Sequence, residues 1–183
     1  MKKVTFFIMC YLNFFLVSCT SHVSSIKKDV DIPLAQKEGY LMLGVDTNYD
    51  LQWVKLWGKK NVLLTKDDLK SGSNFILVNI PEGSYRIESI KLGQYIFNDF
   101  RKELWSFKVK ENVISYVGHL NMESRETFSG VTSNILLLNK SSFALEYLER
   151  RFPNILTSRQ LQYWGQGDDG FFKEVIAVKE AKK

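Results

Sequence analysis

From Gly39 onward, the chain consists of short apolar or alternating runs that are separated by turn residues. Alternation with a period of two places every second side chain on one face of a β-strand, and short strands at a spacing of about ten residues are typical of a β-sandwich. The predicted strands are Tyr40 to Val45, Leu51 to Trp57, Phe75 to Ile80, Ser84 to Leu92, Leu104 to Val109, Val113 to Leu120 and Asn134 to Leu138.

The turn sequences between these strands are Thr47-Asn48-Tyr49-Asp50, Pro81-Glu82-Gly83 and Lys110-Glu111-Asn112. Pro81 presets φ and Gly83 accepts positive φ, so the second turn predicts a β-hairpin. Both faces of Val113 to Leu120 are partly apolar, which favours a central strand that is covered on both sides. Together these patterns predict antiparallel strands in two packed sheets.

One clear helix is predicted near the C-terminus, over residues 141–152. Ser141 or Ser142 can cap its start, Pro153 can end it, and its apolar stripe is Ala144, Leu145, Leu148 and Phe152. This stripe is expected to pack against a sheet. Thr157 to Trp164 is read as a short second helix and residues 93–102 as a loop. Phe171 to Val178 fits both helical and strand periodicity, and a final strand is favoured.

Three short motifs in this β-rich region share an order with a known family. Ile80-Pro81-Glu82-Gly83-Ser84-Tyr85-Arg86 precedes Phe107-Lys108-Val109, and Val113-Ile114-Ser115-Tyr116-Val117-Gly118 follows. This order resembles exported bacterial domains of unknown function that have a prealbumin-like β-sandwich. The resemblance covers residues 39–120 and implies a fold without an activity. The expected fold is therefore mainly β, an antiparallel prealbumin-like β-sandwich with one appended C-terminal helix.

The first residues are typical of a bacterial export signal. Lys2 and Lys3 are followed by the apolar run Val4 to Val17, and Leu16-Val17-Ser18-Cys19 resembles the lipobox of bacterial lipoproteins. The run is shorter than the roughly 20 residues of a membrane-spanning helix, and Leu16 suits a lipobox better than an ordinary signal peptide. The resemblance implies cleavage between Ser18 and Cys19, with acyl chains such as palmitate on Cys19.

Thr20 follows the cysteine at the position where aspartate would keep a Gram-negative lipoprotein at the inner membrane. The resemblance therefore implies the outer membrane, with the domain on its periplasmic face. The expected organisation is a signal peptide over residues 1–18, a lipidated tether over 19–38 and a single domain over 39–183. Polar residues and Pro33 predict that the tether is a flexible coil.

Composition narrows the expected partners. Cys10 lies in the signal peptide and Cys19 takes the lipid, so no intramolecular disulfide is expected. The mature chain has a weak basic excess and no basic run with interleaved aromatic residues, so nucleic acid is not an expected partner. The expected partners are the membrane, through the lipid, and another envelope protein or a glycan.

Residues that could carry catalysis are few. His22 and His119 are the only histidines, and no spacing of His or Cys indicates a metal site, so neither a metal nor a cofactor is expected. The run Gly165 to Gly170 matches G-x-G-x-x-G in letters alone. It lacks the flanking strand and helix of a dinucleotide site, and its adjacent aspartates would repel phosphates, so it is read as a polar surface turn.

Trp53, Lys55 and Trp57 alternate onto one strand face. Such a stripe is read as core, and Trp53 and Trp57 are weak candidates for stacking on a sugar or a partner.

The expected function is that of a lipid-anchored envelope protein, a non-catalytic binding or structural module rather than an enzyme. The alternative is a periplasmic hydrolase with Ser, His119 and Asp dispersed over loops. A cleft that brings these groups together would favour the hydrolase. Apolar packing around His119 would favour the binding or structural module.

Overall fold

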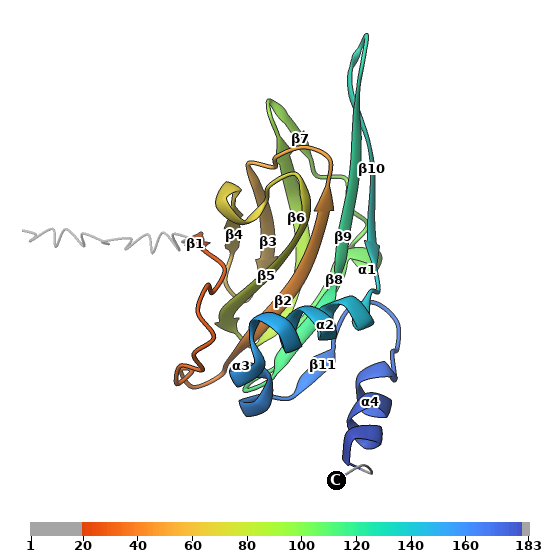
Figure 1. Cartoon of the computed structure of the whole chain (residues 1–183). Coiled ribbons are helices and arrows are strands. Elements are labelled where there is room, and N and C mark those ends of the chain that lie inside the picture. The colour runs from red at the N-terminus through yellow and green to blue at the C-terminus, as the bar shows by residue number, and fades with distance from the viewer. Residues whose placement is uncertain (1–19, 181–183) are drawn as a thin grey trace, which may run out of the picture.

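The computed structural model describes residues 20–180, which fold into two β-sheets with helices packed against one of them (Figure 1). The strands are β1 (Ser21–Val23), β2 (Glu38–Thr47), β3 (Trp53–Gly58), β4 (Val62–Thr65), β5 (Gly72–Pro81), β6 (Gly83–Leu92), β7 (Tyr95–Phe97), β8 (Ser106–Val109), β9 (Ile114–Thr127), β10 (Gly130–Leu138) and β11 (Leu161–Tyr163). The helices are α1 (Lys102–Trp105), α2 (Ser141–Arg151), α3 (Pro153–Ser158) and α4 (Phe171–Glu180), with a 3₁₀ helix, η1, at Lys66–Asp68. The prediction of a mainly β chain is confirmed.

Both sheets contain parallel as well as antiparallel pairs. Sheet A has the order β1-β4-β3-β6-β7, with β8 also paired to β6, and sheet B has the order β10-β9-β2-β5, with β11 also paired to β9. The pairs β1–β4, β2–β9 and β11–β9 are parallel. Purely antiparallel pairing, as predicted, is therefore wrong for these pairs. A turn sequence indicates only how two consecutive strands are paired, whereas β2 and β9 are far apart in the sequence.

The three predicted turns lie where the chain passes from one sheet to the other. They connect β2 to β3, β5 to β6, and β8 to β9, and each connection joins a strand of one sheet to a strand of the other. The hairpin predicted at Pro81-Glu82-Gly83 is therefore wrong, because β5 pairs with β2 while β6 pairs with β3. The Tyr85 hydroxyl donates to the Pro81 carbonyl at 2.7 Å and ties this corner together.

The described residues form two hydrophobic cores, one on each side of sheet B. Leu41 and Leu43 of β2 lie between the sheets, where they belong to the first core. Tyr40 and Met42 of the same strand belong to the second core, which sheet B shares with Leu148 of α2 and other helix residues. Alternate side chains of a strand point to opposite faces. Since β2 is covered on both faces, its sequence reads as a nearly continuous apolar run.

The C-terminal part contains three helices among residues 141–180, where one was predicted. Helix α2 matches the predicted residues closely, and Pro153 is the first residue of α3, a position that suits proline. Thr157 to Trp164 is not one helix, since β11 lies within it. The favoured strand over residues 171–178 is also wrong. These residues form α4, which buries Phe172 and leaves Val178 53% exposed.

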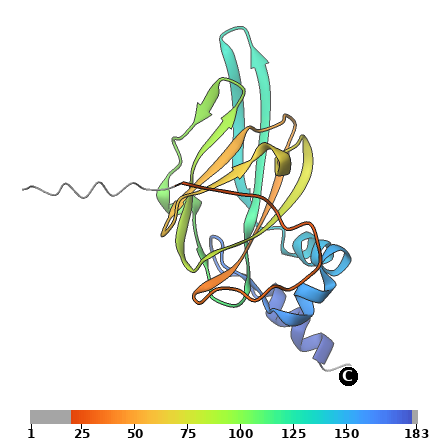
Figure 2. The same cartoon turned by 90° about the vertical axis from the view of Figure 1, so that its left-hand side faces the viewer.

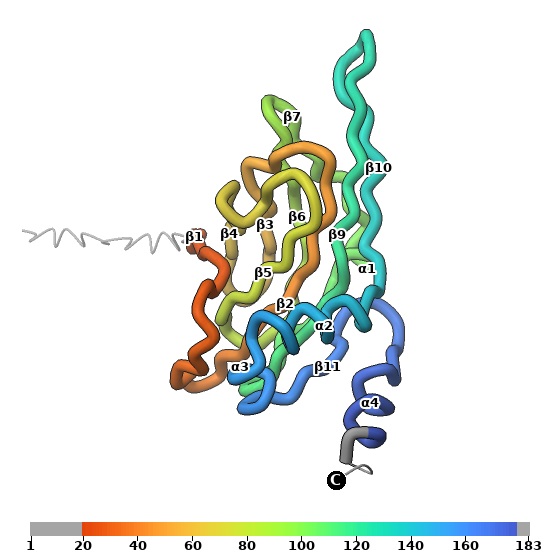
Figure 3. The backbone as a smooth tube through the Cα atoms, viewed as in Figure 1, coloured from red at the N-terminus to blue at the C-terminus, as the bar shows by residue number. Residues whose placement is uncertain are grey.

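Segments between the predicted strands also differ from expectation. Residues 93–102, read as a loop, contain β7 and the first residue of α1. Strand β4 was not predicted. The hairpin of β9 and β10 extends well beyond the other strands of the sandwich (Figure 3), and Phe128 at its turn is fully exposed.

Residues 20–38 run along the domain from β1 to the C-terminal helices (Figure 2). β1 pairs with β4, and the Ile26 amide donates to the Leu77 carbonyl at 2.8 Å. Lys27 forms an ion pair with the buried carboxylate of Asp68, which also accepts from the Ser25 amide at 2.7 Å. The expected flexible coil is therefore wrong for these residues. The polar residues of this segment predict a solvated coil, but their polar groups form hydrogen bonds and ion pairs with the domain.

Asp29 provides a direct test of this packing. Its carboxylate accepts hydrogen bonds from the backbone amides of Asn154 and Ile155, at 2.8 and 3.0 Å, in the first turn of α3. Loss of such a capping interaction typically costs about 0.5–2 kcal/mol. We expect Asp29→Ala to lower the free energy of unfolding by about 1 kcal/mol in urea melts. Lys28→Ala, at an exposed neighbouring position, is the control, and equal losses in both variants would contradict the capping role.

Candidate functional site

His119 lies in β9 at an irregular point of sheet B. The pairing of β2 with β9 shifts register between Met42 and Gly44, next to Gly118, which has a φ of 118°. The imidazole is 2% exposed and meets the ring of Phe75 edge to face, with 5.2 Å between ring centroids. Gly44 of β2 pairs with both His119 and Phe75, and an added Cβ there would be 1.9 Å from Nδ1. The ring therefore fills a closed position on the helix side of sheet B.

Three side chains around this position contact the carboxylate of Asp46 in β2. Lys140 Nζ lies 2.7 Å from Asp46 Oδ2, and His119 Nε2 lies 3.0 Å from the same oxygen. Ser73, opposite Asp46 on β5, also donates to the carboxylate. Lys140 precedes α2, so its ion pair fixes the start of that helix to the central strand of sheet B.

The charges of this cluster follow from burial and contact. Burial would raise the pKa of the Asp46 carboxyl, but hydrogen bonds from Lys140 and Ser73, together with the nearby His119 ring, outweigh it and lower the pKa to about 2. Burial lowers the pKa of His119 below its usual value, against the opposing effect of the Asp46 carboxylate. At neutral pH the cluster therefore contains an ionised Asp46–Lys140 pair and a neutral imidazole.

This arrangement differs from a hydrolytic triad. A triad histidine lies between the nucleophile and the carboxylate, and it must reach the substrate. Here Asp46 lies between Ser73 and His119, and the imidazole is closed off from solvent. Neither ring nitrogen makes a well-directed hydrogen bond within residues 20–180, although Nε2 is close to Asp46. The cluster can link elements of the fold, but its geometry is unsuited to proton transfer from an attacking hydroxyl.

The tryptophan stripe lies on the outer face of sheet A. Val54 and Leu56, which alternate with Trp53, Lys55 and Trp57 along β3, are buried between the sheets. The stripe therefore faces outward, and the Trp57 side chain is 45% exposed. Its interpretation as core is wrong, because the alternate residues of β3 supply the core. A strand's alternation identifies two faces, and the larger side chains here occupy the outer one.

Cations accompany the tryptophans on this face. The Arg86 guanidinium lies over the ring of Trp57, 4.5 Å from its centroid. Lys55 Nζ is 2.7 Å from Glu88 Oε2. Lys91 lies opposite Trp53 in the pairing of β3 with β6. The result is a surface of aromatic rings and basic groups, of which the sequence had indicated only Trp53, Lys55 and Trp57.

A separate cleft of about 290 Å³ lies between β11, α4 and the Gly165–Gly170 loop. Tyr163, Trp164 and Phe172 contribute aromatic surface to it, while Asp168 and Lys173 contribute charge. The loop is a surface turn, as predicted, but β11 precedes it and α4 follows it, so the expected absence of a flanking strand and helix is wrong. Its Asp169 accepts hydrogen bonds from Asn139 and Ser141 and so connects the loop to the start of α2.

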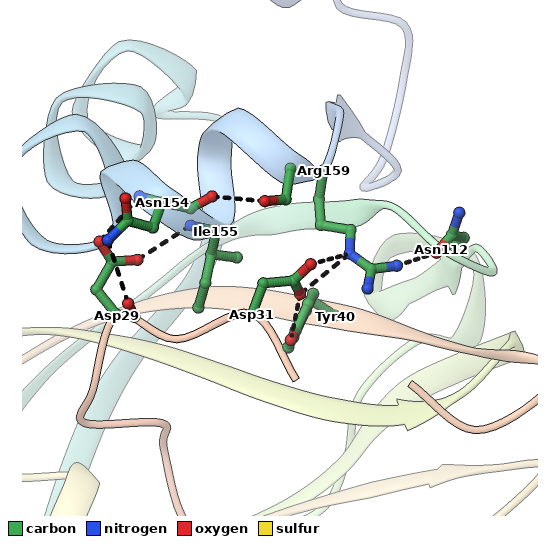
Figure 4. A network of polar contacts seen from close by, with 8 residues as sticks. Asp29, Asp31, Tyr40, Asn112, Asn154, Ile155 and Arg159 are labelled. Carbon is green, nitrogen blue, oxygen red and sulfur yellow. Dashed lines mark hydrogen bonds and ion pairs between the residues drawn. The ribbon is translucent and has the colours of Figure 1, made fainter. Parts of the chain in front are cut away.

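A second polar network joins residues 20–38 to the helices (Figure 4). Arg159 Nε donates to Asp31 at 2.9 and 3.1 Å, and the same guanidinium donates to Asn112. The Tyr40 hydroxyl donates to Asp31 at 3.0 Å. Burial raises the pKa of Tyr40 to about 12, and the bond to Asp31 adds to the effect. The sequence carried no signal for this network, because its members come from separate parts of the chain.

Within residues 20–180, no three His, Cys, Asp or Glu side chains lie close enough to hold a metal ion. No helix in the same range has the length and apolar character needed to cross a membrane. Comparison of the chain with protein-family models, curated proteins and solved structures finds no match.

Proposed function

We propose that this chain is a bacterial lipoprotein, anchored through Cys19, whose domain is a non-catalytic binding or structural module of the cell envelope. The observation that carries the proposal is the lipobox Leu16-Val17-Ser18-Cys19 after a basic and an apolar segment. These residues lie outside the described part of the chain. Thr20 after the cysteine favours the periplasmic face of the outer membrane. The partner is the membrane, together with another envelope protein or a glycan.

The prealbumin-like assignment of the sandwich is part of the same proposal. Its support is the two-sheet arrangement, in which Pro81-Glu82-Gly83 leads into β6 and β8 is followed by β9. The parallel pairs of sheet B are a departure from the antiparallel expectation.

The surroundings of His119 support a module over a hydrolase. Its imidazole packs against Phe75 and Gly44, and Asp46 is already engaged by Lys140. Packing of this buried ring against Phe75 favours a binding or structural module. A hydrolase would need its base in an accessible pocket beside the nucleophile.

The lipid anchor gives the direct test. In cells, the mature protein should begin at Cys19, carry acyl chains there and fractionate with membranes. Cys19→Ala should abolish fatty-acid labelling and release the protein from the membrane fraction. Cys10→Ala, within the apolar part of the signal, is the matched control and should retain labelling. An unmodified Cys19 or a different mature N-terminus in mass spectrometry would refute the proposal.

A further inference from the structure

We infer that the outer face of sheet A lies on the bilayer surface, where its tryptophans and cations contact anionic phospholipid headgroups. This face is defined by Trp53, Lys55, Trp57, Arg86 and Lys91, with Ile96 of β7 at its side. The inference deepens the proposed function and rests on anchoring through Cys19. It assigns the folded domain a membrane contact of its own, in addition to the acyl chains.

The proposed anchor is adjacent in the sequence to the edge strand of sheet A. Thr20 directly follows Cys19, and β1 begins at the next residue, Ser21. β1 is the edge strand of sheet A and pairs with β4. A flexible coil of some 20 residues would allow a distance of about 25 Å between lipid and domain. Residues 20–38 instead lie against the domain, so the edge of sheet A is held next to the lipid site.

The side chains of this face match the chemistry of lipid headgroups. Tryptophan rings are favoured at the level of lipid headgroups, and Lys and Arg side chains can place their charge among phosphates while their stems cover apolar surface. Along β3 and β6, the charged side chains are Lys55, Arg86 and Lys91 against the single carboxylate of Glu88. Glu88 is already paired with Lys55. The face is therefore complementary to an anionic surface.

Helices α2, α3 and α4 pack against the outer side of sheet B. They contribute Leu148, Ile155 and Phe172 to the core on that side. The outer side of sheet A presents Trp57 at 45% and Ile96 at 54% exposure. Exposed aromatic and aliphatic side chains on the face of a sheet are costly in water and are stabilised at a membrane interface.

Cys19 also makes the experiment possible, because it is the only cysteine after the signal peptide. The chain from residue 19 onward can be coupled through this thiol to a maleimide lipid in preformed vesicles. Vesicles of phosphatidylethanolamine and phosphatidylglycerol with brominated acyl chains should quench tryptophan emission, and high salt should reduce the quenching. Trp53→Phe combined with Trp57→Phe should remove most of the effect, since Trp105 is only 8% exposed and Trp164 is half-buried in the cleft beside β11 and α4.

Charge variants test the orientation. Lys55→Gln with Lys91→Gln should lower the ratio of docked to undocked domain by about 30-fold, from the usual contribution of basic residues near an anionic membrane. Arg150→Gln with Lys173→Gln removes the same charge from α2 and α4 and should leave quenching unchanged. Equal losses in the two pairs, or equal quenching in phosphatidylcholine vesicles, would overturn the inference.

The coupling is chemical, so its outcome is independent of acylation in cells. Absence of quenching while cellular Cys19 is acylated would overturn the membrane-facing orientation alone. Absence of acylation in cells would overturn the anchor and, with it, this inference. Binding of a soluble glycan to the tryptophans without lipid quenching would also count against it, since the occupant would then be a sugar.

Discussion

Leu148→Ala is expected to lower the free energy of unfolding by about 2–5 kcal/mol. Leu148 of α2 is fully buried in the core between sheet B and the helices, together with Ala144, Phe152 and Tyr40. Truncation removes the transfer free energy of the side chain. It also leaves a cavity, because the paired strands of sheet B beneath α2 can relax only partly to fill it. Urea melts of the purified domain measure the loss, which is a large share of the stability of a domain this size.

Glu146→Ala is the matched control on the same helix. Its side chain is exposed, and substitutions at exposed helix positions usually change stability by less than about 0.5 kcal/mol. If both variants unfold at the same urea concentration, the apolar side chains of α2 are not buried against sheet B in solution. The helices would then have to be regarded as a surface for a partner.

The apolar pattern identified most strands and α2, but it did not identify their neighbours. Alternation along β3 and β6 reflects burial on one face, and it is the same whether a following turn makes a hairpin or a corner between sheets. At Pro81-Glu82-Gly83, the local preferences were correct and the pairing was decided by packing elsewhere. Likewise, Phe172 could belong to a strand or a helix until its packing near Tyr116 was known.

Residues 20–38 show a different reason for error. Asp29, Asp31 and Lys27 look like solvated groups when only composition is considered. Each has a partner more than 40 positions away: Asn154, Arg159 and Asp68, respectively. Charge pairs over such separations leave no local pattern, so a sequence with many polar residues can read as a coil and still be ordered.

The candidate site was anticipated only in part. His119 was singled out because histidines are scarce, and Trp53 and Trp57 because they alternate. The contact of His119 with Asp46 depends on the parallel pairing of β2 with β9, which no turn sequence encodes. The face around Trp57 depends on Arg86 and Lys91, which β6 contributes by pairing with β3. Tertiary pairing supplies both sites.

Gly44→Ala is expected to destabilise the domain by about 3 kcal/mol, at the upper end of the usual cost of overpacking. An added Cβ would lie 1.9 Å from Nδ1 of His119 and 2.4 Å from its Cε1. The ring cannot easily retreat, because Phe75 meets it edge to face and Asp46 contacts Nε2. Thermal or urea unfolding of the variant measures the cost.

A double-mutant cycle identifies the cause of this cost. In a His119→Ala background the ring atoms nearest the alanine at position 44 are absent, so the cost of that alanine should fall below about 1 kcal/mol. The coupling between the two substitutions should then be about 2 kcal/mol in favour of the double variant. If Gly44→Ala costs the same in both backgrounds, contact with the imidazole is not its cause. That result would contradict the close packing of the His119 ring, which distinguishes this cluster from an accessible catalytic base.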